Sequence, residues 1–168
     1  MSVKFNIDEI FEMAEQIERN GQIFYRHAGN IMPPESESQK LMLLLADMEI
    51  KHEKIFADMR KDILNQNAMD SILNPDFDPD GLAGMYLRAI VDGKIFNLIK
   101  PPDEYFTENE TAENLLKSAI QREKDAIIFY LGIKESISKD FGQDKVDLII
   151  KEEMSHITYI SNEIKRRQ

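Results

Sequence analysis

Four long stretches of the chain repeat apolar residues every three or four positions, and this periodicity restricts the possible folds more than any other feature. The stretches cover about residues 7–31, 35–65, 111–138 and 143–167. Pro33 and Pro34 separate the first two stretches, and "DFG" at 140–142 separates the last two. Long helices with one apolar face bury that face by packing side by side. The pattern therefore predicts an all-α fold, a four-helix bundle built from two helical hairpins.

The segment 67–110 joins the two hairpins and is rich in Pro, Asp, Asn and Gly at both ends. A short helix over about 82–92 is expected in its middle. Because a connection this long can follow the length of a bundle, we predict one long crossover between the hairpins. The apolar stretch "MYLRAIVDGKIF" at 85–96 could pack across a dimer interface or cover its own bundle, and the sequence favours neither.

Composition narrows the class of protein further. A chain of 168 residues predicts a single domain over 1–168. A net charge of −10 argues against a nucleic-acid partner, which needs clustered Lys and Arg. The absence of cysteine excludes a thiolate metal site within this sequence. The first residues lack the apolar stretch of a signal peptide, and the densest apolar run, "LMLLLA" at 41–46, is too short to cross a bilayer. We therefore expect a cytoplasmic protein that does not enter the membrane.

Each long helix carries ionisable residues in the middle of its apolar stripe, where the pattern asks for apolar ones. The two halves of the chain repeat this exception. "ERNGQIFY" at 18–25 matches "EKDAIIFY" at 123–130, and a Glu-x-x-His pair follows about thirty residues later in each half. The residues concerned are Glu18, Glu49 and His52 in the first half, and Glu123, Glu153 and His156 in the second.

Four carboxylates gathered inside a bundle would repel one another and lose hydration, which is severely destabilising without compensation. Two divalent cations balance four negative charges, and neutral imidazoles complete the ligand set. Glu and His at positions i and i+3 lie on one helical face, so both can reach the same ion. The sequence therefore predicts a dimetal site with six ligands, and we expect two iron ions, with manganese or a mixed pair as alternatives.

Several other residues allow more than one interpretation. Glu152 lies four positions before His156 and could replace Glu153, although the spacing in the second helix favours Glu153. Tyr25 and Tyr130 could be core aromatics or could donate a hydrogen bond to a ligand carboxylate. The remaining candidates are interpreted as structural: Glu9, Glu12, Glu15 and Glu53 as solvated faces, His27 as a surface or cap residue, and Met42, Met48 and Met59 as packing.

The six predicted ligands, with the "FY" that follows each lone Glu, resemble those of the rubrerythrin-like branch of the ferritin-like superfamily. The resemblance covers the four long helices and implies a ferritin-like bundle with a carboxylate-bridged di-iron or dimanganese site. It implies that Glu49 and Glu153 bridge the metals. Glu18 and His52 would complete the ligands of one ion, and Glu123 and His156 those of the other.

Two departures from the rubrerythrin pattern affect the expected activity. Rubrerythrins carry a rubredoxin-like domain that supplies electrons, and this sequence contains no cysteine to build one. Their third helix also has a second Glu, three residues after the first, where this chain has Ala126. The resemblance therefore implies an oxidoreductase that reacts with peroxide or dioxygen, as a peroxidase or ferroxidase, and uses a separate electron donor such as a rubredoxin.

Two other classes of function remain open at this stage. The bundle could bind, store or deliver iron without catalytic turnover, or it could be a structural or regulatory protein whose metal stabilises the fold. We expect a homodimer. No catalytic residue is expected beyond the metal ligands.

Overall fold

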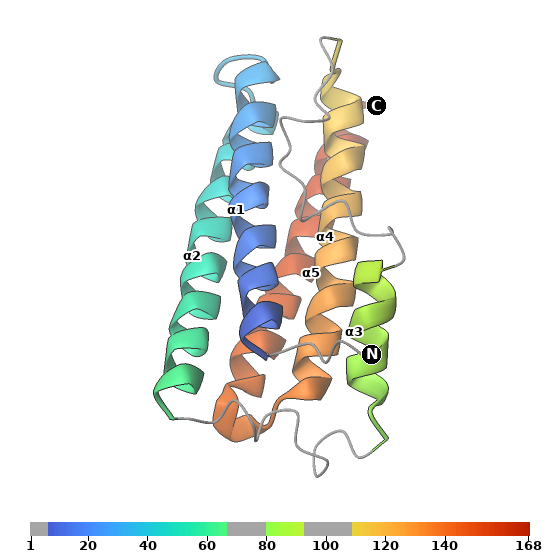
Figure 1. The fold of residues 1–168 in the computed structure, drawn as a ribbon. Coiled ribbons are helices and arrows are strands. Elements are labelled where there is room, and N and C mark those ends of the chain that lie inside the picture. Colours follow the sequence, from blue (N-terminus) through green and yellow to red (C-terminus); the bar gives the residue numbers. More distant parts are fainter. Residues whose placement is uncertain (1–6, 67–79, 93–108) are drawn as a thin grey trace.

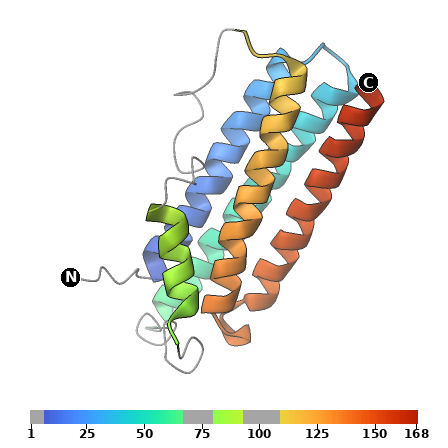
Figure 2. The ribbon, with the colours of Figure 1, turned by 90° about the vertical axis from the view of Figure 1, so that its right-hand side faces the viewer.

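The computed structural model describes residues 7–66, 80–92 and 109–168, and four long helices make up its bundle. These are α1 (Ile7–Ile31), α2 (Glu37–Asn65), α4 (Ala112–Ser136) and α5 (Gln143–Arg167). The short helix α3 (Leu82–Asp92) lies beside them, and one 3₁₀ turn, η4 (Lys139–Phe141), precedes α5. Figures 1 and 2 show the four long helices side by side, with their axes nearly aligned. The predicted all-α, four-helix architecture is confirmed.

Local capping explains where α2 and α4 begin, one or two residues inside the predicted ranges. The Ser36 hydroxyl accepts a hydrogen bond from the Gln39 backbone N–H at 3.1 Å, so α2 begins at Glu37 rather than residue 35. Thr111 caps α4 in the same way through the Asn114 N–H at 3.2 Å. Helix α4 ends at Ser136 because Ile137 is already extended.

The bundle is closed by contacts of α1 with α2, α2 with α5, α5 with α4, and α4 with α1. In Figure 1, α2 and α4 run in the same direction, so α4 begins at the end of the bundle opposite to the end where α2 stops. The connection between them must therefore travel the length of the bundle, as predicted. Between the end of α2 and the start of α4, the structure describes mainly α3 and the few residues next to the helix ends.

Helix α3 packs on α4 and covers part of its own bundle. Leu87 and Ile90 are buried, and the Tyr86 hydroxyl donates a hydrogen bond to the Ile128 carbonyl of α4 at 2.7 Å. A Cβ atom at Gly132 would lie 2.5 Å from a Leu87 methyl carbon, so glycine is needed for this close approach. Of the two interpretations of 85–96, the described residues support coverage of the bundle; 93–96 lie outside the described residues.

The core consists of two apolar clusters, one toward each end of the bundle, with a polar layer between them. One cluster includes Phe11, Phe56 and Tyr130, and the other includes Tyr25 and Leu45. Along each long helix, the ionisable residues predicted from the sequence fall between the residues of the two clusters. The fold therefore seals this polar layer in the middle of the bundle.

Candidate metal centre

All six predicted ligands lie together in the polar layer and are buried. They form two groups, each with ligand atoms within 4.8 Å of one another. The first group is Glu18, Glu49, His52 and Glu153, and the second is Glu49, Glu123, Glu153 and His156. Glu49, the most accessible of the six, is only 5% exposed. Because Glu49 and Glu153 belong to both groups, the arrangement has the connectivity of two cation positions joined by two shared carboxylates.

The two imidazole rings turn the same nitrogen toward the carboxylates. His52 Nδ1 lies 3.1 Å from Glu153 Oε1 and 3.6 Å from Glu18 Oε2. His156 Nδ1 lies 2.8 Å from Glu153 Oε2 and 3.4 Å from Glu123 Oε1. Glu153 therefore faces one histidine with each of its oxygens, as a carboxylate placed between two cations would.

Most of the inward-facing ligand atoms lie within ion-pair distance of one another but make no hydrogen bond of good geometry in the protein. They are Glu18 Oε2, Glu49 Oε1, His52 Nδ1, both Glu153 oxygens and His156 Nδ1. Buried polar atoms without partners are costly, and native structures rarely gather several of them at one point. A carboxylate and imidazole donor set of this kind suits iron or manganese. The residues present therefore fit a dimetal centre.

Two tyrosines close the polar layer, one from each side. The Tyr25 hydroxyl of α1 donates a hydrogen bond to Glu123 of α4, and the Tyr130 hydroxyl of α4 donates one to Glu18 of α1. Each bond therefore joins the two halves of the repeat. At Glu18 it leaves Oε2 turned toward His52, whereas at Glu123 the oxygen that accepts from Tyr25 is also the one that lies 3.4 Å from His156 Nδ1. Both interpretations of these tyrosines hold, because their rings lie in the apolar clusters and their hydroxyls bond to predicted ligands.

The cluster without metal holds protons where cations would otherwise be. Burial raises the pKa of Glu18, Glu49 and Glu153, and the charges of neighbouring carboxylates raise those of Glu49 and Glu153 further. Burial lowers the pKa of both imidazoles, but the adjacent carboxylates outweigh it and raise the pKa of His52 to about 12 and that of His156 to about 9. Both rings are therefore imidazolium at neutral pH and supply part of the positive charge that the carboxylates require.

Glu152 does not replace Glu153 in either group, but it contacts the cluster from outside. Its Oε2 lies 2.6 Å from His52 Nε2, on the side of the ring away from the other carboxylates. The Glu152 side chain is 39% exposed, whereas that of Glu153 is 1% exposed. Glu153 is therefore the buried residue of the two, as predicted. The contact between Glu152 and His52 was not predicted.

Gly21 is a further residue of the site that sequence reasoning missed. A Cβ atom at this position would lie 2.1 Å from Glu49 Oε2 and 2.9 Å from Glu49 Cδ. The Glu49 carboxylate therefore occupies the space that any larger side chain at position 21 would take. The signal in the sequence was a glycine on the apolar stripe of a helix, one turn after Glu18.

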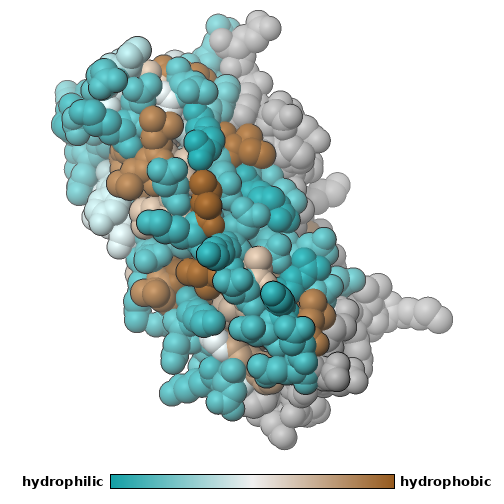
Figure 3. Space-filling model, turned by 90° about the vertical axis from the view of Figure 1, so that its left-hand side faces the viewer, coloured by the Kyte–Doolittle hydropathy of each residue, from teal (hydrophilic) through white to brown (hydrophobic). Residues whose placement is uncertain are grey.

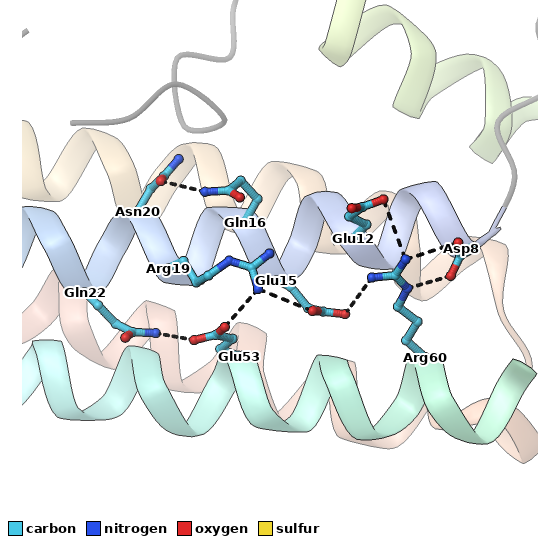
Figure 4. Close-up of polar contacts among 9 residues, drawn as sticks. All are labelled: Asp8, Glu12, Glu15, Gln16, Arg19, Asn20, Gln22, Glu53 and Arg60. Carbon is cyan, nitrogen blue, oxygen red and sulfur yellow. Dashed lines mark hydrogen bonds and ion pairs between the residues drawn. The ribbon is translucent and has the colours of Figure 1, made fainter. Parts of the chain in front are cut away.

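A separate network between α1 and α2 contains four other carboxylates, those of Asp8, Glu12, Glu15 and Glu53 (Figure 4). Arg60 binds Asp8 through two nitrogens and also contacts Glu15, while Arg19 pairs with Glu53 at 3.0 Å. The interpretation of Glu15 as a solvated residue was wrong: it is 8% exposed, because arginines cover it. Among the described residues, the two metal-compatible groups contain none of these carboxylates.

A crystal structure from Thermotoga maritima, of a protein described as a candidate ferritin-like diiron-carboxylate protein, matches this chain with a TM-score of 0.73 and 23% sequence identity. The match covers 98% of each chain. No protein-family model and no curated protein matches the sequence. At this identity the likeness shows the fold. The chain is thus a ferritin-like helical bundle with a buried carboxylate–histidine cluster that is compatible with a metal site.

Proposed function

We propose that the chain is a di-iron or dimanganese carboxylate protein of the rubrerythrin-like branch, an oxidoreductase of peroxidase or ferroxidase type. One observation carries the proposal: two buried groups of carboxylate and imidazole ligands share Glu49 and Glu153, and most of their inward-facing atoms make no hydrogen bond in the protein. In this proposal Glu18 and His52 complete one metal position, and Glu123 and His156 complete the other.

In this proposal the protein holds the metal ions, orients their ligands and shields the centre from water. When bound, a pair of redox-active metal ions supplies the electrons that peroxide or dioxygen accepts. Tyr25 and Tyr130 fix the orientation of Glu123 and Glu18 by hydrogen bonds from the opposite half of the repeat. The apolar clusters on both sides of the polar layer exclude water and larger molecules. Repeated turnover would need an external electron donor, such as a separate rubredoxin.

The test is metal analysis of protein loaded anaerobically with ferrous iron, followed by rapid mixing with peroxide or dioxygen. About two irons per chain, ferric absorption appearing on mixing and consumption of the oxidant are expected. Glu49→Ala, which removes a ligand shared by both groups, should lose most of the metal, and His156→Ala should lose about one of the two irons. His27→Gln, a change of the one histidine outside the cluster, should keep both. Bound iron that is released without any consumption of oxidant would instead indicate an iron-binding or delivery protein. Wild-type protein that stays metal-free would contradict both.

We also propose that the protein is cytoplasmic and forms a homodimer. None of the described helices combines the length and apolar character needed to cross a membrane. Exposed apolar side chains occur on the outer sides of α2 and α5, including Leu44, Ile50, Leu148 and Met154. Figure 3 shows that the apolar side chains on the face it presents lie in separate small groups on a mostly hydrophilic surface. Sedimentation analysis of wild type and of Leu44→Glu tests whether the exposed apolar side chains of α2 and α5 form a dimer interface.

A further inference from the structure

The two halves of the cluster differ at the outer nitrogen of each histidine. The rings are nearly parallel, with an interplanar angle of 18° and centroids 5.7 Å apart, and both turn Nδ1 toward the carboxylates. His52 Nε2 lies 2.6 Å from Glu152 Oε2. His156 Nε2 is buried and has no hydrogen-bond partner. The outer nitrogen of His52 is therefore hydrogen-bonded to a carboxylate, and the outer nitrogen of His156 is not.

A single difference between the two halves of the repeat accounts for this. Glu152 lies four residues before His156, and the equivalent residue four positions before His52 is Met48. Glu152 of α5 reaches across to His52 of α2, so the equivalent contact in the other direction would run from Met48 to His156. A thioether is only a weak hydrogen-bond acceptor. The two halves of the repeat thus have the same three ligand types but differ in the residue expected next to the outer nitrogen of each histidine, which is Glu152 for His52 and Met48 for His156.

Resting on the dimetal function proposed above, we propose that Glu152 is a positioning residue that makes the two metal positions unequal. A carboxylate only accepts hydrogen bonds, so the His52 ring donates its Nε2–H and presents Nδ1 to the metal. Such a contact orients a ligating imidazole and strengthens its electron donation, and its loss typically costs 10–100-fold in metal affinity. The position of Glu18 and His52 is therefore filled first, and the position of Glu123 and His156 second.

The probe is Co²⁺, titrated anaerobically at fixed pH and followed by calorimetry and by the visible absorption of the bound ion. Two binding steps by themselves would not test the proposal, because two cations that share Glu49 and Glu153 repel each other whatever residue stands at 152. The order of filling is assigned with two variants: His52→Ala should lose the tighter step, and His156→Ala should lose the weaker one.

Glu152→Met then gives both halves the same residue. The tighter step should weaken about 10–100-fold and approach the weaker one, with two ions still bound. Met48→Glu is the converse variant and should tighten the weaker step. The matched control is Glu53→Met, which removes a carboxylate that also adjoins a predicted ligand in sequence. Glu53 pairs with Arg19 and Gln22 rather than with an imidazole, so its loss should leave both steps unchanged.

The outcomes separate this inference from the proposed function. If wild-type protein binds no Co²⁺, the dimetal function itself is overturned. If two ions bind and neither Glu152→Met nor Met48→Glu changes the steps, or if the Glu123 and His156 position fills first, only the role of Glu152 is overturned. Binding of a single ion by folded Glu152→Met would make Glu152 a ligand rather than a positioning residue. Unfolding of either variant, detected by circular dichroism, leaves the decision to the other.

Discussion

Replacing Gly21 with alanine should damage metal binding without unfolding the protein. The new Cβ would lie 2.1 Å from Glu49 Oε2 and 3.2 Å from Glu49 Cγ, whereas ordinary carbon contacts begin near 3.4 Å. The carboxylate oxygen must therefore move by about 1.3 Å, and the approach to Cγ means that the side chain cannot simply rotate its tip away. Metal–ligand distances tolerate only about 0.2 Å. Because Glu49 belongs to both groups, we expect both ions to bind at least about 10–100-fold more weakly.

The stability of the metal-free protein should change much less. Alanine is favoured over glycine inside a helix by about 0.8–1.0 kcal/mol, and crowding at Glu49 costs about 1–3 kcal/mol, so the two effects partly cancel. Urea unfolding of the metal-free protein measures this balance, and Co²⁺ titration measures the affinity. Gly29→Ala is the matched control on the same helix, since its nearest neighbours would be Leu43 at 3.0 Å and Met42 at 3.6 Å, neither of which belongs to the cluster. Wild-type affinity for two ions in Gly21→Ala would refute the reasoning.

Three further predictions start from the hydrogen bonds and protonation of the metal-free protein. Tyr130→Phe leaves the buried Glu18 oxygen without its donor, so the free energy of unfolding should fall by about 1–3 kcal/mol in urea titrations. Glu49→Gln should raise the free energy of unfolding near pH 7, because burial and the neighbouring carboxylates hold the pKa of Glu49 well above normal. The gain should be about 1–3 kcal/mol. It should vanish below the ordinary pKa of Glu, where the wild-type carboxyl is protonated in both the folded and the unfolded state. Metal binding at pH 7 should release at least the protons of His52 and His156, whose pKa values are about 12 and about 9. The affinity should therefore rise with pH, more steeply below about pH 9 than above it, and calorimetry in buffers of different ionisation enthalpy counts the protons.

The fold could be predicted from the sequence because its signals are local. Apolar periodicity locates a helix, prolines separate two of them, and a long polar connection indicates a crossover. The helix ends were less accurate, since they depend on caps such as Ser36 and on backbone angles such as that of Ile137, which no periodicity reports.

The composition of the cluster was also predictable, for a related reason. An ionisable residue on an apolar stripe must be buried wherever that stripe is buried, so Glu18 and Glu123 were identifiable before the partners of their helices were known. Which tyrosine contacts which carboxylate was not predictable. That pairing depends on how α1 and α4 are rotated about their axes, and spacing along one helix carries no information about rotation relative to another. The burial of Glu15 was missed for the same reason, because one of the arginines that cover it comes from α2.

The repeat and its exceptions therefore carry different information about this site. Repetition of a lone Glu and a Glu-x-x-His pair predicts a symmetric centre, in which each half contributes the same three ligands. The structure departs from symmetry at positions that are not ligands: Gly21 is matched by Ala126, and Met48 by Glu152. Gly21 makes room for Glu49, which both groups share, whereas Glu152 supports His52, which belongs only to the group that contains Glu18. A pair of metal positions with identical ligands can thus be made chemically distinct by the residues behind the ligands, and such a distinction suits a centre whose two ions are loaded in order.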